Sequence, residues 1–305
     1  MFFLGNLYCF MHAKAEEIKG SHFNFVAAGD WGCGHEALNT FSMMKSMKPE
    51  LYLGLGDYSY AETPDCWFNI VSSVGPAFKI ALGNHDTNDQ LLRAYMDKFN
   101  LDNQYYSFDY QNSHFIALST ELNERDQAGQ LMFVKKDLVR SRANPNIDWT
   151  IVYFHRPFYS GSEGHIADMR KTYHPLFEEY EVDLVIQGHS HNYQRSYPLL
   201  YNDLNPSRPI LSTREQSYYD DPSGIIFIIV GTGGESIQTV DKRAYLASTF
   251  NGYGCINIEI NGKSMDAEYY SDSNNTIDHF VITKENSLEK FNPELKAERI
   301  EFSNH

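Results

Sequence analysis

Seven side chains that can bind metal ions follow five short apolar segments of the chain. The segments cover residues 23–28, 51–55, 79–82, 149–154 and 184–187. The donors in the loops after them are Asp30, Asp57, Tyr60, Asn84, His155, His189 and His191. Carboxylate, amide, phenol and imidazole groups without a cysteine suit borderline to hard transition ions such as Fe, Mn or Zn. The pattern indicates a metal site, and two such ions close together can hold and cleave a phosphate ester.

The apolar segments also predict how these donors come together. They are expected to be buried strands, and ligands bind at the carboxyl ends of strands in α/β sheets. Glycine precedes the donor in four of the five loops, which permits a tight turn beside an ion. An extended backbone would point His189 and His191 to opposite faces, so we expect the chain to turn there. Asp57 is expected to be central, since one carboxylate can bridge two ions.

Between the five segments the hydrophobic pattern alternates between strand and helix. Helical periodicity predicts helices at 35–47, 90–99, 129–142 and 169–180. A hairpin is expected from strands at 105–110 and 114–119. Beyond residue 190 the helical signal fades, and strands are predicted at 224–230, 254–260, 265–270 and 277–283. Asn261-Gly262 is a strong two-residue hairpin signal, and the C-terminal part is expected to form a second sheet.

This order of elements predicts an α/β fold, a four-layer α/β/β/α sandwich of two mixed β-sheets flanked by helices. No internal repeat or low-complexity linker divides the chain, so residues 21–285 are expected to form one domain. Residues 1–20 are interpreted as a signal or a disordered N-terminus, and residues 286–305 as a polar C-terminal tail.

The composition limits the partners of the chain. Its 305 residues carry a formal net charge of −15, and a surface of that sign repels nucleic acid phosphates. No apolar run approaches the roughly 20 residues needed to span a bilayer, so no stable membrane association is expected. An acidic protein that acts on phosphate esters needs a local source of positive charge, and metal ions are the obvious one.

Two interpretations of the N-terminus stay open. Residues 2–11 are mostly apolar, and Ala13-Lys14-Ala15 resembles the small-residue cleavage site of a secretory signal. No lysine or arginine precedes the apolar stretch, however, as a signal normally requires. The protein is secreted or extracytoplasmic if residues 1–15 act as a signal, and cytoplasmic otherwise.

The four cysteines do not decide between these interpretations. Cys9 lies in the region of the signal, which leaves Cys33, Cys66 and Cys255, an odd number without metal-like spacing. A bridge between Cys33 and Cys66 is one alternative, but buried free thiols are the expected state.

Each loop alone also has a structural explanation. Gly-Asp at a strand end is commonly a turn or a helix cap, and Asn84-His85-Asp86 fits a polar turn. His-x-His lies more often at a surface than on a metal. Five such loops in this order, each directly after an apolar segment, have no economical structural explanation. The combination therefore favours a functional site.

The five loops together resemble those of a known enzyme family. The ordered motifs Gly-Asp-x-Gly, Gly-Asp-x-x-Tyr, Gly-Asn-His-Asp, a strand-terminal His and Gly-His-x-His look like those of the calcineurin-like metallophosphoesterases. Tyr60, three residues after Asp57, narrows the resemblance to the purple acid phosphatase branch. The similarity continues through residues 193–195, 230–234 and 252–254, and covers roughly residues 23–283.

The resemblance implies two metal ions with separate ligand sets. The first is a ferric ion and the second a divalent Fe, Zn or Mn ion. The ligands divide as Asp30, Tyr60 and His191 for the ferric ion and Asn84, His155 and His189 for the divalent ion, with Asp57 shared. His85 and His165 match positions where the family places histidines that contact phosphate or assist the leaving group. Two departures, Gln194 in place of the usual Glu and Cys33 beside the first loop, leave the tuning of the site open.

The implied function is hydrolysis of small phosphate monoesters by an acid phosphatase with a metal-bound hydroxide as nucleophile. A trivalent ion should lower the pKa of bound water further than zinc does, which predicts an acidic optimum. A phosphodiesterase or nucleotidase with the same dinuclear site is the first alternative, and a degenerate phosphate-binding or interaction protein is the second. Asp86 is expected to orient an imidazole, and Arg195 fits a structural ion pair and a phosphate clamp equally. Physiological substrate, second metal and oligomeric state stay undetermined.

Overall fold

The strands form two large mixed sheets in the computed structural model, which describes residues 21–162 and 164–284. The first sheet has seven strands, in the order β11 (Tyr218–Asp220), β16 (Thr276–Thr283), β15 (Ser264–Ser271), β14 (Gly254–Asn261), β1 (His22–Ala28), β2 (Leu51–Gly54) and β3 (Phe78–Ile80). The second sheet also has seven, in the order β13 (Leu246–Phe250), β8 (Tyr193–Ser196), β12 (Ile226–Val230), β7 (Leu184–Gln187), β6 (Trp149–Phe154), β5 (Ser113–Ala117) and β4 (Tyr106–Tyr110). A separate two-stranded ribbon pairs β9 (Leu199–Leu200) with β10 (Ile210–Leu211).

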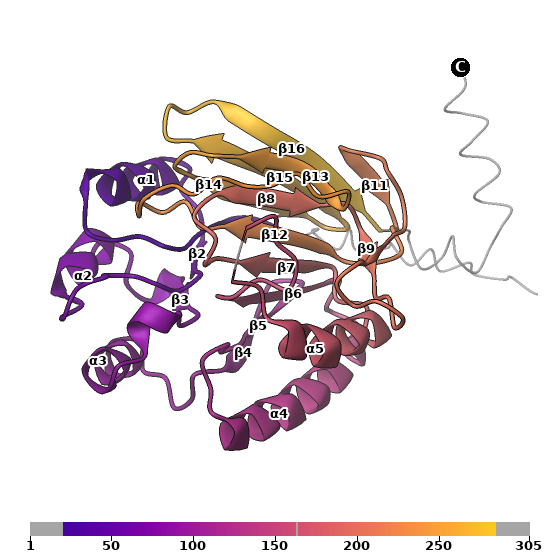
Figure 1. Ribbon diagram of the computed structural model, residues 1–305, viewed down its shortest axis with the longest axis horizontal. Helices are drawn as coiled ribbons and strands as arrows, with labels where there is room; N and C mark the ends of the chain where they lie inside the picture. The colour runs from indigo at the N-terminus through magenta and orange to yellow at the C-terminus, as the bar shows by residue number, and fades with distance from the viewer. Residues whose placement is uncertain (1–20, 163, 285–305) are drawn as a thin grey trace, which may run out of the picture.

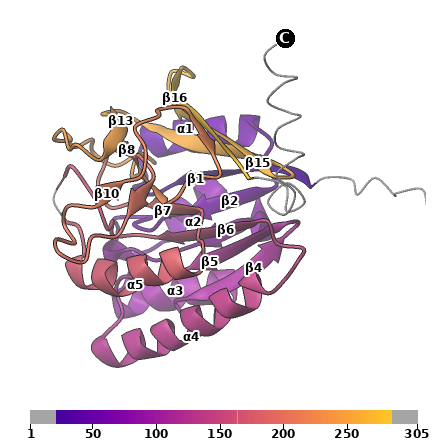
Figure 2. The same ribbon diagram turned by 90° about the vertical axis from the view of Figure 1, so that its right-hand side faces the viewer.

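Helices cover the outer faces of both sheets. The α-helices in the described ranges are α1 (His35–Ser46), α2 (Asp65–Val71), α3 (Asp89–Phe99), α4 (Glu124–Arg142) and α5 (Ala167–Glu179). Figures 1 and 2 show α1 on one side of the strands, with α4 and α5 on the opposite side. Phe41 of α1 packs near Tyr52 of β2, with ring centroids 6.0 Å apart, whereas Phe177 of α5 packs in a cluster with Phe227 of β12. The predicted four-layer α/β/β/α sandwich is confirmed.

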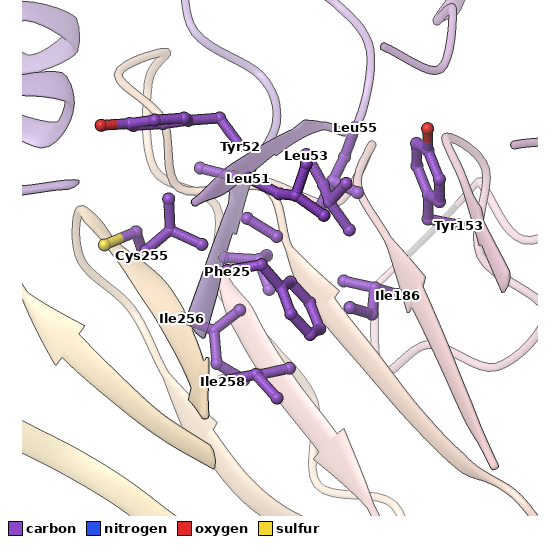
Figure 3. Packing of buried hydrophobic residues seen from close by; sticks show 14 of the residues in the cluster. Phe25, Leu51, Tyr52, Leu53, Leu55, Tyr153, Ile186, Cys255, Ile256 and Ile258 are labelled. Atoms are coloured by element: carbon purple, nitrogen blue, oxygen red, sulfur yellow. The ribbon is translucent and has the colours of Figure 1, made fainter. Parts of the chain in front are cut away.

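Alternate residues of a strand point to opposite faces, and β6 shows what each face of the second sheet meets. Tyr153 belongs to the same buried apolar cluster as Phe25 of the first sheet. Val152 and Phe154 belong to the cluster that α4 and α5 cover. Figure 3 shows Phe25 and Ile186 in the core between the two sheets. Burial on both faces explains why β6 is a continuous apolar run.

The strands beyond residue 190 divide between the two sheets, which corrects the expectation that they form a second sheet of their own: β8, β12 and β13 join the second sheet, and β11, β14, β15 and β16 join the first. β14 pairs antiparallel with β1, so that His22 lies opposite Asn261, and β15 and β16 continue outward from β14. On its other side β1 pairs parallel with β2. The chain therefore leaves the first sheet after β3 and returns to it with β11 and with its last three strands. Strand pairing depends on long-range packing, which the local hydrophobic pattern does not encode.

Several element boundaries differ from those predicted. α2 was not predicted, because its 7 residues are too few for a helical period to show. α4 begins at Glu124 rather than Gly129, since the side chain of Asn123 caps its first turn.

In the part of the chain that the structure describes, no helix is both long enough and apolar enough to cross a membrane.

Cys33 and Cys66 form a disulfide with their Cα atoms 5.8 Å apart, which corrects the expectation of free thiols. The sequence could not place Cys66, because it lies on the unpredicted helix α2. Cys255 is buried and free. The bridge ties the loop that carries Asp30 to the helix that follows Tyr60. The expected signal at residues 1–20, with Cys9, and the expected tail at 286–305 lie outside the described residues.

A buried histidine links β5 to its neighbours. His114 is 1% exposed, and its ring nitrogens lie 2.5 Å from Asp109 and 2.8 Å from Asp137. Arg140 lies 2.5 Å from the other oxygen of Asp137. Burial alone would lower the pKa of His114, but its hydrogen bonds and ion pairs with Asp137 and Asp109 outweigh burial and raise the pKa. The protonated ring is therefore the stable form in the fold.

Replacing Cys33→Ser is expected to lower the free energy of unfolding by about 3–4 kcal/mol, because the bridge closes a loop with a sequence separation of 33 residues. Chemical denaturation without reductant measures the loss, and reductant should bring the wild type to the value of the variant. Cys255→Ala keeps the bridge and serves as the control, whose stability should still fall with reductant. A wild-type midpoint that does not move under reductant would contradict the bridge.

Removal of the His114 imidazole is expected to change how stability depends on pH. Folding raises the pKa of His114 above its unfolded value of about 6.5. The ring therefore contributes fully to the unfolding free energy below pH 6.5, and this contribution is lost as pH rises through the pKa of the folded state. His114→Gln should therefore lower the unfolding free energy by about 2 kcal/mol at pH 6 and by less at pH 9. Denaturation of both proteins across this range measures the difference. An equal loss at both pH values would mean that the ring is neutral in the fold.

Candidate metal centre

The loops after β1, β2, β3, β6 and β7 meet at one edge of the two sheets. Within this cluster, every predicted donor lies within hydrogen-bond distance of at least one other donor. The members are Asp30, Asp57, Tyr60, Asn84, His155, His189 and His191. The structure therefore brings together the whole set of seven side chains that the sequence singled out.

One group of donor atoms surrounds the Tyr60 hydroxyl. This oxygen lies 3.3 Å from Asp30 Oδ1, 3.3 Å from Asp57 Oδ2 and 3.1 Å from His191 Nε2. His191 Nε2 is also 3.4 Å from Asp30 Oδ1. The group thus joins two carboxylates, a phenol and an imidazole.

A second group surrounds the imidazole of His155. Its Nε2 lies 3.2 Å from Asp57 Oδ2, 3.2 Å from Asn84 Oδ1 and 3.1 Å from His189 Nδ1. The donor atoms of Asp57, His155 and His189 all lie within 4.8 Å of one another. Asp57 Oδ2 belongs to both groups, so a single carboxylate oxygen joins them.

The spacing of these atoms fits metal ligands. Donors held at about 2.0–2.1 Å from a common ion lie about 2.8–3.4 Å apart in octahedral or tetrahedral geometry. Most atoms in both groups are hydrogen-bond acceptors, whose lone pairs repel each other unless a proton or a cation lies between them. The residues present therefore suit one cation in each group.

Backbone carbonyls orient two of the imidazoles. His155 Nδ1 donates to the carbonyl of Leu55 at 2.8 Å, and His191 Nδ1 donates to the carbonyl of Ser236 at 2.8 Å. A carbonyl can only accept, so the proton of each neutral ring is on Nδ1. The lone pair of each Nε2 then points at the donor cluster, which is the arrangement that metal-binding histidines need.

Four of the seven donors have left-handed backbone conformations. The φ angles are 59° at Asp30, 54° at Asp57, 50° at Tyr60 and 69° at His189. Residues other than glycine seldom adopt this region, and they retain it only where the surrounding structure enforces it. The turn expected between His189 and His191 is present, since the left-handed conformation of His189 ends the extended backbone of β7.

Asp86 provides much of this enforcement, in a role that corrects the expectation that it orients an imidazole. Its buried carboxylate accepts hydrogen bonds from the backbone N–H groups of Asp57 at 2.7 Å, Tyr58 at 3.0 Å and Gly83 at 2.8 Å. It therefore fixes the backbone of two donor loops together. Burial, followed by the charge of Asp57, raises the pKa of Asp86 to about 7 despite these hydrogen bonds.

The glycine before Asn84 is required by close packing. A Cβ atom at Gly83 would lie 2.2 Å from Asp57 Oδ1, which no side chain could relieve without moving the shared carboxylate. The sequence predicted that a glycine here permits a tight turn beside an ion. The group that Gly83 approaches in the structure is the side chain of Asp57.

The titration of the donors follows from burial and from their mutual contacts. Burial, and then the charges of Asp30 and Asp57, raise the pKa of Tyr60 far above its usual range. Burial also opposes ionisation of Asp57, but the charge and hydrogen bond of His155 outweigh it and lower the pKa to about 2. Burial and then the charge of His155 lower the pKa of His189 to about 3. Tyr60 would thus lose its proton only to a cation, whereas His189 keeps a free lone pair.

His85 lies at the edge of the donor cluster. Its backbone N–H donates to Asp57 Oδ1 at 2.8 Å, and its Nε2 lies 3.9 Å from Asp57 Oδ2. Its ring lies against Tyr60, with centroids 4.4 Å apart, and 51% of its side chain is exposed. His165 lines a neighbouring cavity that also contains Arg170, and no hydrogen bond joins its ring to a donor among the described residues. The structure therefore places only the first of the two predicted catalytic histidines beside the donors.

Arg156 is a polar residue of the site that the sequence interpretation missed. Its Nη1 lies 3.4 Å from His189 Nε2, and its Nε donates to Glu121 at 2.7 Å. Its position directly after His155 was the available signal. It brings a positive charge to the rim of the donor cluster.

Two residues near the cluster have supporting roles. Arg195 is buried and donates through Nε and Nη2 to both oxygens of Asp278, at 2.6 and 2.9 Å, so it forms the structural ion pair. Gln194 accepts from the N–H of Gly161 at 2.7 Å and donates to Ser160 at 3.1 Å. The side chain of Gln194 thus fixes Ser160 and Gly161, and the hydroxyl of Ser160 in turn contacts Ser190 beside His189.

Comparison with known proteins gives relatives with phosphatase names. A phosphoenolpyruvate phosphatase of Allium cepa is 24% identical over 339 aligned positions, which cover 95% of this chain and 68% of that protein. Purple acid phosphatase 21 of Arabidopsis thaliana is 27% identical over 69% of this chain and 49% of that protein. This chain therefore spans about two thirds of the length of the first relative and about half of the length of the second.

The fold has a counterpart of known structure, and a family model matches most of the site. The structure of a purple acid phosphatase from yellow lupin (Lupinus luteus) seeds has a TM-score of 0.74 at 21% identity, and it covers 87% of this chain and 54% of that one. Residues 23–193, more than half of the 305, match the model described as calcineurin-like phosphoesterase. The chain belongs to the calcineurin-like phosphoesterase family.

Proposed function

We propose that the chain hydrolyses phosphate monoesters at a dinuclear metal centre and is an acid phosphatase. The observation that carries this proposal is Asp57 Oδ2, which lies 3.3 Å from Tyr60 and 3.2 Å from His155 and so belongs to both groups of donors. One carboxylate oxygen between two sets of ligands is the arrangement that two neighbouring cations require. The phosphatase names of the relatives support the same class of reaction.

The two groups differ in chemistry, which supports different ions. Asp30, Tyr60 and His191 offer a phenol and a carboxylate, so with Asp57 they suit the harder ferric ion. Asn84, His155 and His189 offer a neutral amide and two imidazoles, so they suit a divalent Fe, Zn or Mn ion. When bound, the two ions would neutralise phosphate charge and supply a nucleophilic water of lowered pKa.

The chain's own residues would position the substrate and move protons. His85 lies at the edge of the cluster, with half of its side chain exposed, and can give a proton to a leaving alkoxide. Arg156 can attract a phosphate oxygen to the rim, although it already shares its charge with Glu121. The buried carboxylate of Asp57 must stay ionised, which its lowered pKa of about 2 favours even in acid. A catalytic role for His165 stays a prediction.

The alternatives make different demands on the same site. A phosphodiesterase or nucleotidase would use the same donors on a different class of phosphate ester. A degenerate interaction protein need not retain all seven donors, and their complete presence argues against it.

The disulfide supports export, since such bridges persist in oxidising compartments, and thereby favours a signal at residues 1–15.

Purified protein should hydrolyse p-nitrophenyl phosphate with a kcat/KM at least about tenfold above that for bis-p-nitrophenyl phosphate, because a dianionic monoester can interact with both cations. Asp57→Asn should lower monoester kcat/KM by more than about 100-fold and lose metal by elemental analysis. Asp97→Asn, at an exposed position on α3, is the matched control. A faster diester would favour the phosphodiesterase, and no turnover of either by metal-loaded protein would favour the interaction protein.

Aerobically purified protein should be violet, because a tyrosine phenolate on ferric iron absorbs visible light by charge transfer. Tyr60→Phe removes the phenol oxygen and is expected to abolish the band, as an absorption spectrum would record. Tyr58→Phe is the control: its hydroxyl donates to the carbonyl of Ala81, away from the donors, so the colour should persist. Unchanged colour in Tyr60→Phe would rule out this tyrosine as an iron ligand.

A further inference from the structure

A cavity with basic residues in its wall lies beside Ser160, whose hydroxyl contacts Ser190 between the donors His189 and His191. Its volume is about 490 Å³, and its walls carry three guanidinium groups, those of Arg170, Arg208 and Arg243, together with the imidazole of His165. No carboxylate lines it among the described residues, although the whole chain has a net charge of −15. Three hydroxyl-bearing residues, Ser160, Ser207 and Tyr245, also line it. The cavity is therefore a positive region in an acidic protein.

Arg170 is the buried centre of this cavity. It is only 4% exposed, and among the described residues it forms no ion pair with a carboxylate. Its Nη1 donates to the carbonyl of Phe158 at 2.7 Å, and its guanidinium lies over the ring of Tyr159, 5.2 Å from the centroid. Its buried Nε has no hydrogen-bond partner in the described chain. A buried cation and an unused donor both carry a desolvation cost, which a bound anion would offset.

The neighbours of Arg170 add positive charge and little that neutralises it. Arg243 lies 3.4 Å from Asp241, but both side chains are largely exposed, and such surface pairs are weak. Burial, and then the charges of Arg170 and Arg243, lower the pKa of His165. That effect places the imidazole within the field of both guanidinium groups. Together these groups can surround an oxyanion from several sides.

The cavity and the donor cluster share one wall. Ser160, which lines the cavity, lies 3.0 Å from Ser190 Oγ, between the donors His189 and His191. A Cβ atom on Gly164 would lie 2.3 Å from His189 Nε2, so the backbone just before His165 lies against that imidazole. Consecutive Cα atoms are about 3.8 Å apart, and His165 follows Gly164 directly. The wall of the cavity therefore lies next to the donor His189.

We propose that this cavity is a second phosphate-binding site, with Arg170 as its anchor. The guanidinium group presents donors in a fixed fork that matches two oxygens of one phosphate, and its contacts with Phe158 and Tyr159 hold it in place before binding. The phosphate has two sources, free inorganic phosphate or a second phosphate group on a substrate held at the metal donors. The second source rests on the proposed phosphatase function, whereas the first does not.

Equilibrium dialysis of the purified full-length protein against radiolabelled inorganic phosphate tests the site itself. At saturation, the wild type is expected to bind about one phosphate per chain more than Arg170→Gln. Arg243→Gln, at an exposed position where folding is not at risk, should weaken the same site at least tenfold. Arg93→Gln, on α3 and outside the cavity, is the control. Phosphate uptake that is equal in the wild type and in both cavity variants would overturn the proposal.

A substrate comparison then identifies the source of the phosphate. If substrates supply it, the ratio of kcat/KM for fructose 1,6-bisphosphate to that for fructose 6-phosphate should fall at least tenfold in Arg243→Gln. An unchanged ratio, with the loss of phosphate in dialysis, would assign the site to free phosphate. Absence of any phosphatase activity would refute the proposed function and leave the dialysis result to decide on the site.

Discussion

The carboxylate of Asp86 accepts hydrogen bonds from three backbone amides, and the geometry of the donor cluster depends on it. Two of these amides belong to the loop after β2 and one to the loop after β3, so a single buried group fixes both loops. The left-handed conformation of Asp57 persists only under such constraint. The close approach of Gly83 to Asp57 has the same origin. The shared oxygen of Asp57 can therefore serve two groups of donors because a residue outside both groups holds its backbone.

Charge is distributed unevenly around the site. The donor cluster holds the buried carboxylates of Asp30 and Asp57, which favour cations, whereas the neighbouring cavity holds three arginines, which favour an anion. The segment with Ser160 and Gly164 separates the two, and Gln194 holds it through hydrogen bonds to Ser160 and Gly161. A glutamate in place of Gln194 would add a negative charge in this wall, and its carboxylate could not donate to Ser160 as the amide does.

The sequence predicted most of the donor cluster because its information is local. Each donor follows an apolar strand directly, and the ends of such strands can be recognised from a few residues. The pairing of β14 with β1 was missed because nothing within either segment specifies its partner. The disulfide was considered but ranked below free thiols, because α2 is too short to show a period and Cys66 could not be placed without it. The role of Asp86 was misjudged since its partners are backbone amides, which leave no trace in residue type.

The position of β1 in the first sheet has a consequence for the order in which the molecule can be built. All seven donors lie between residues 30 and 191, yet β1, from which the first donor loop emerges, pairs with β14 at residues 254–261. Contacts across such a separation form slowly, because a long loop must close before they stabilise the chain. During synthesis the donor loops therefore emerge well before the strand that completes their sheet. The chain must stay soluble and unaggregated with β1 unpaired on one edge until that strand arrives.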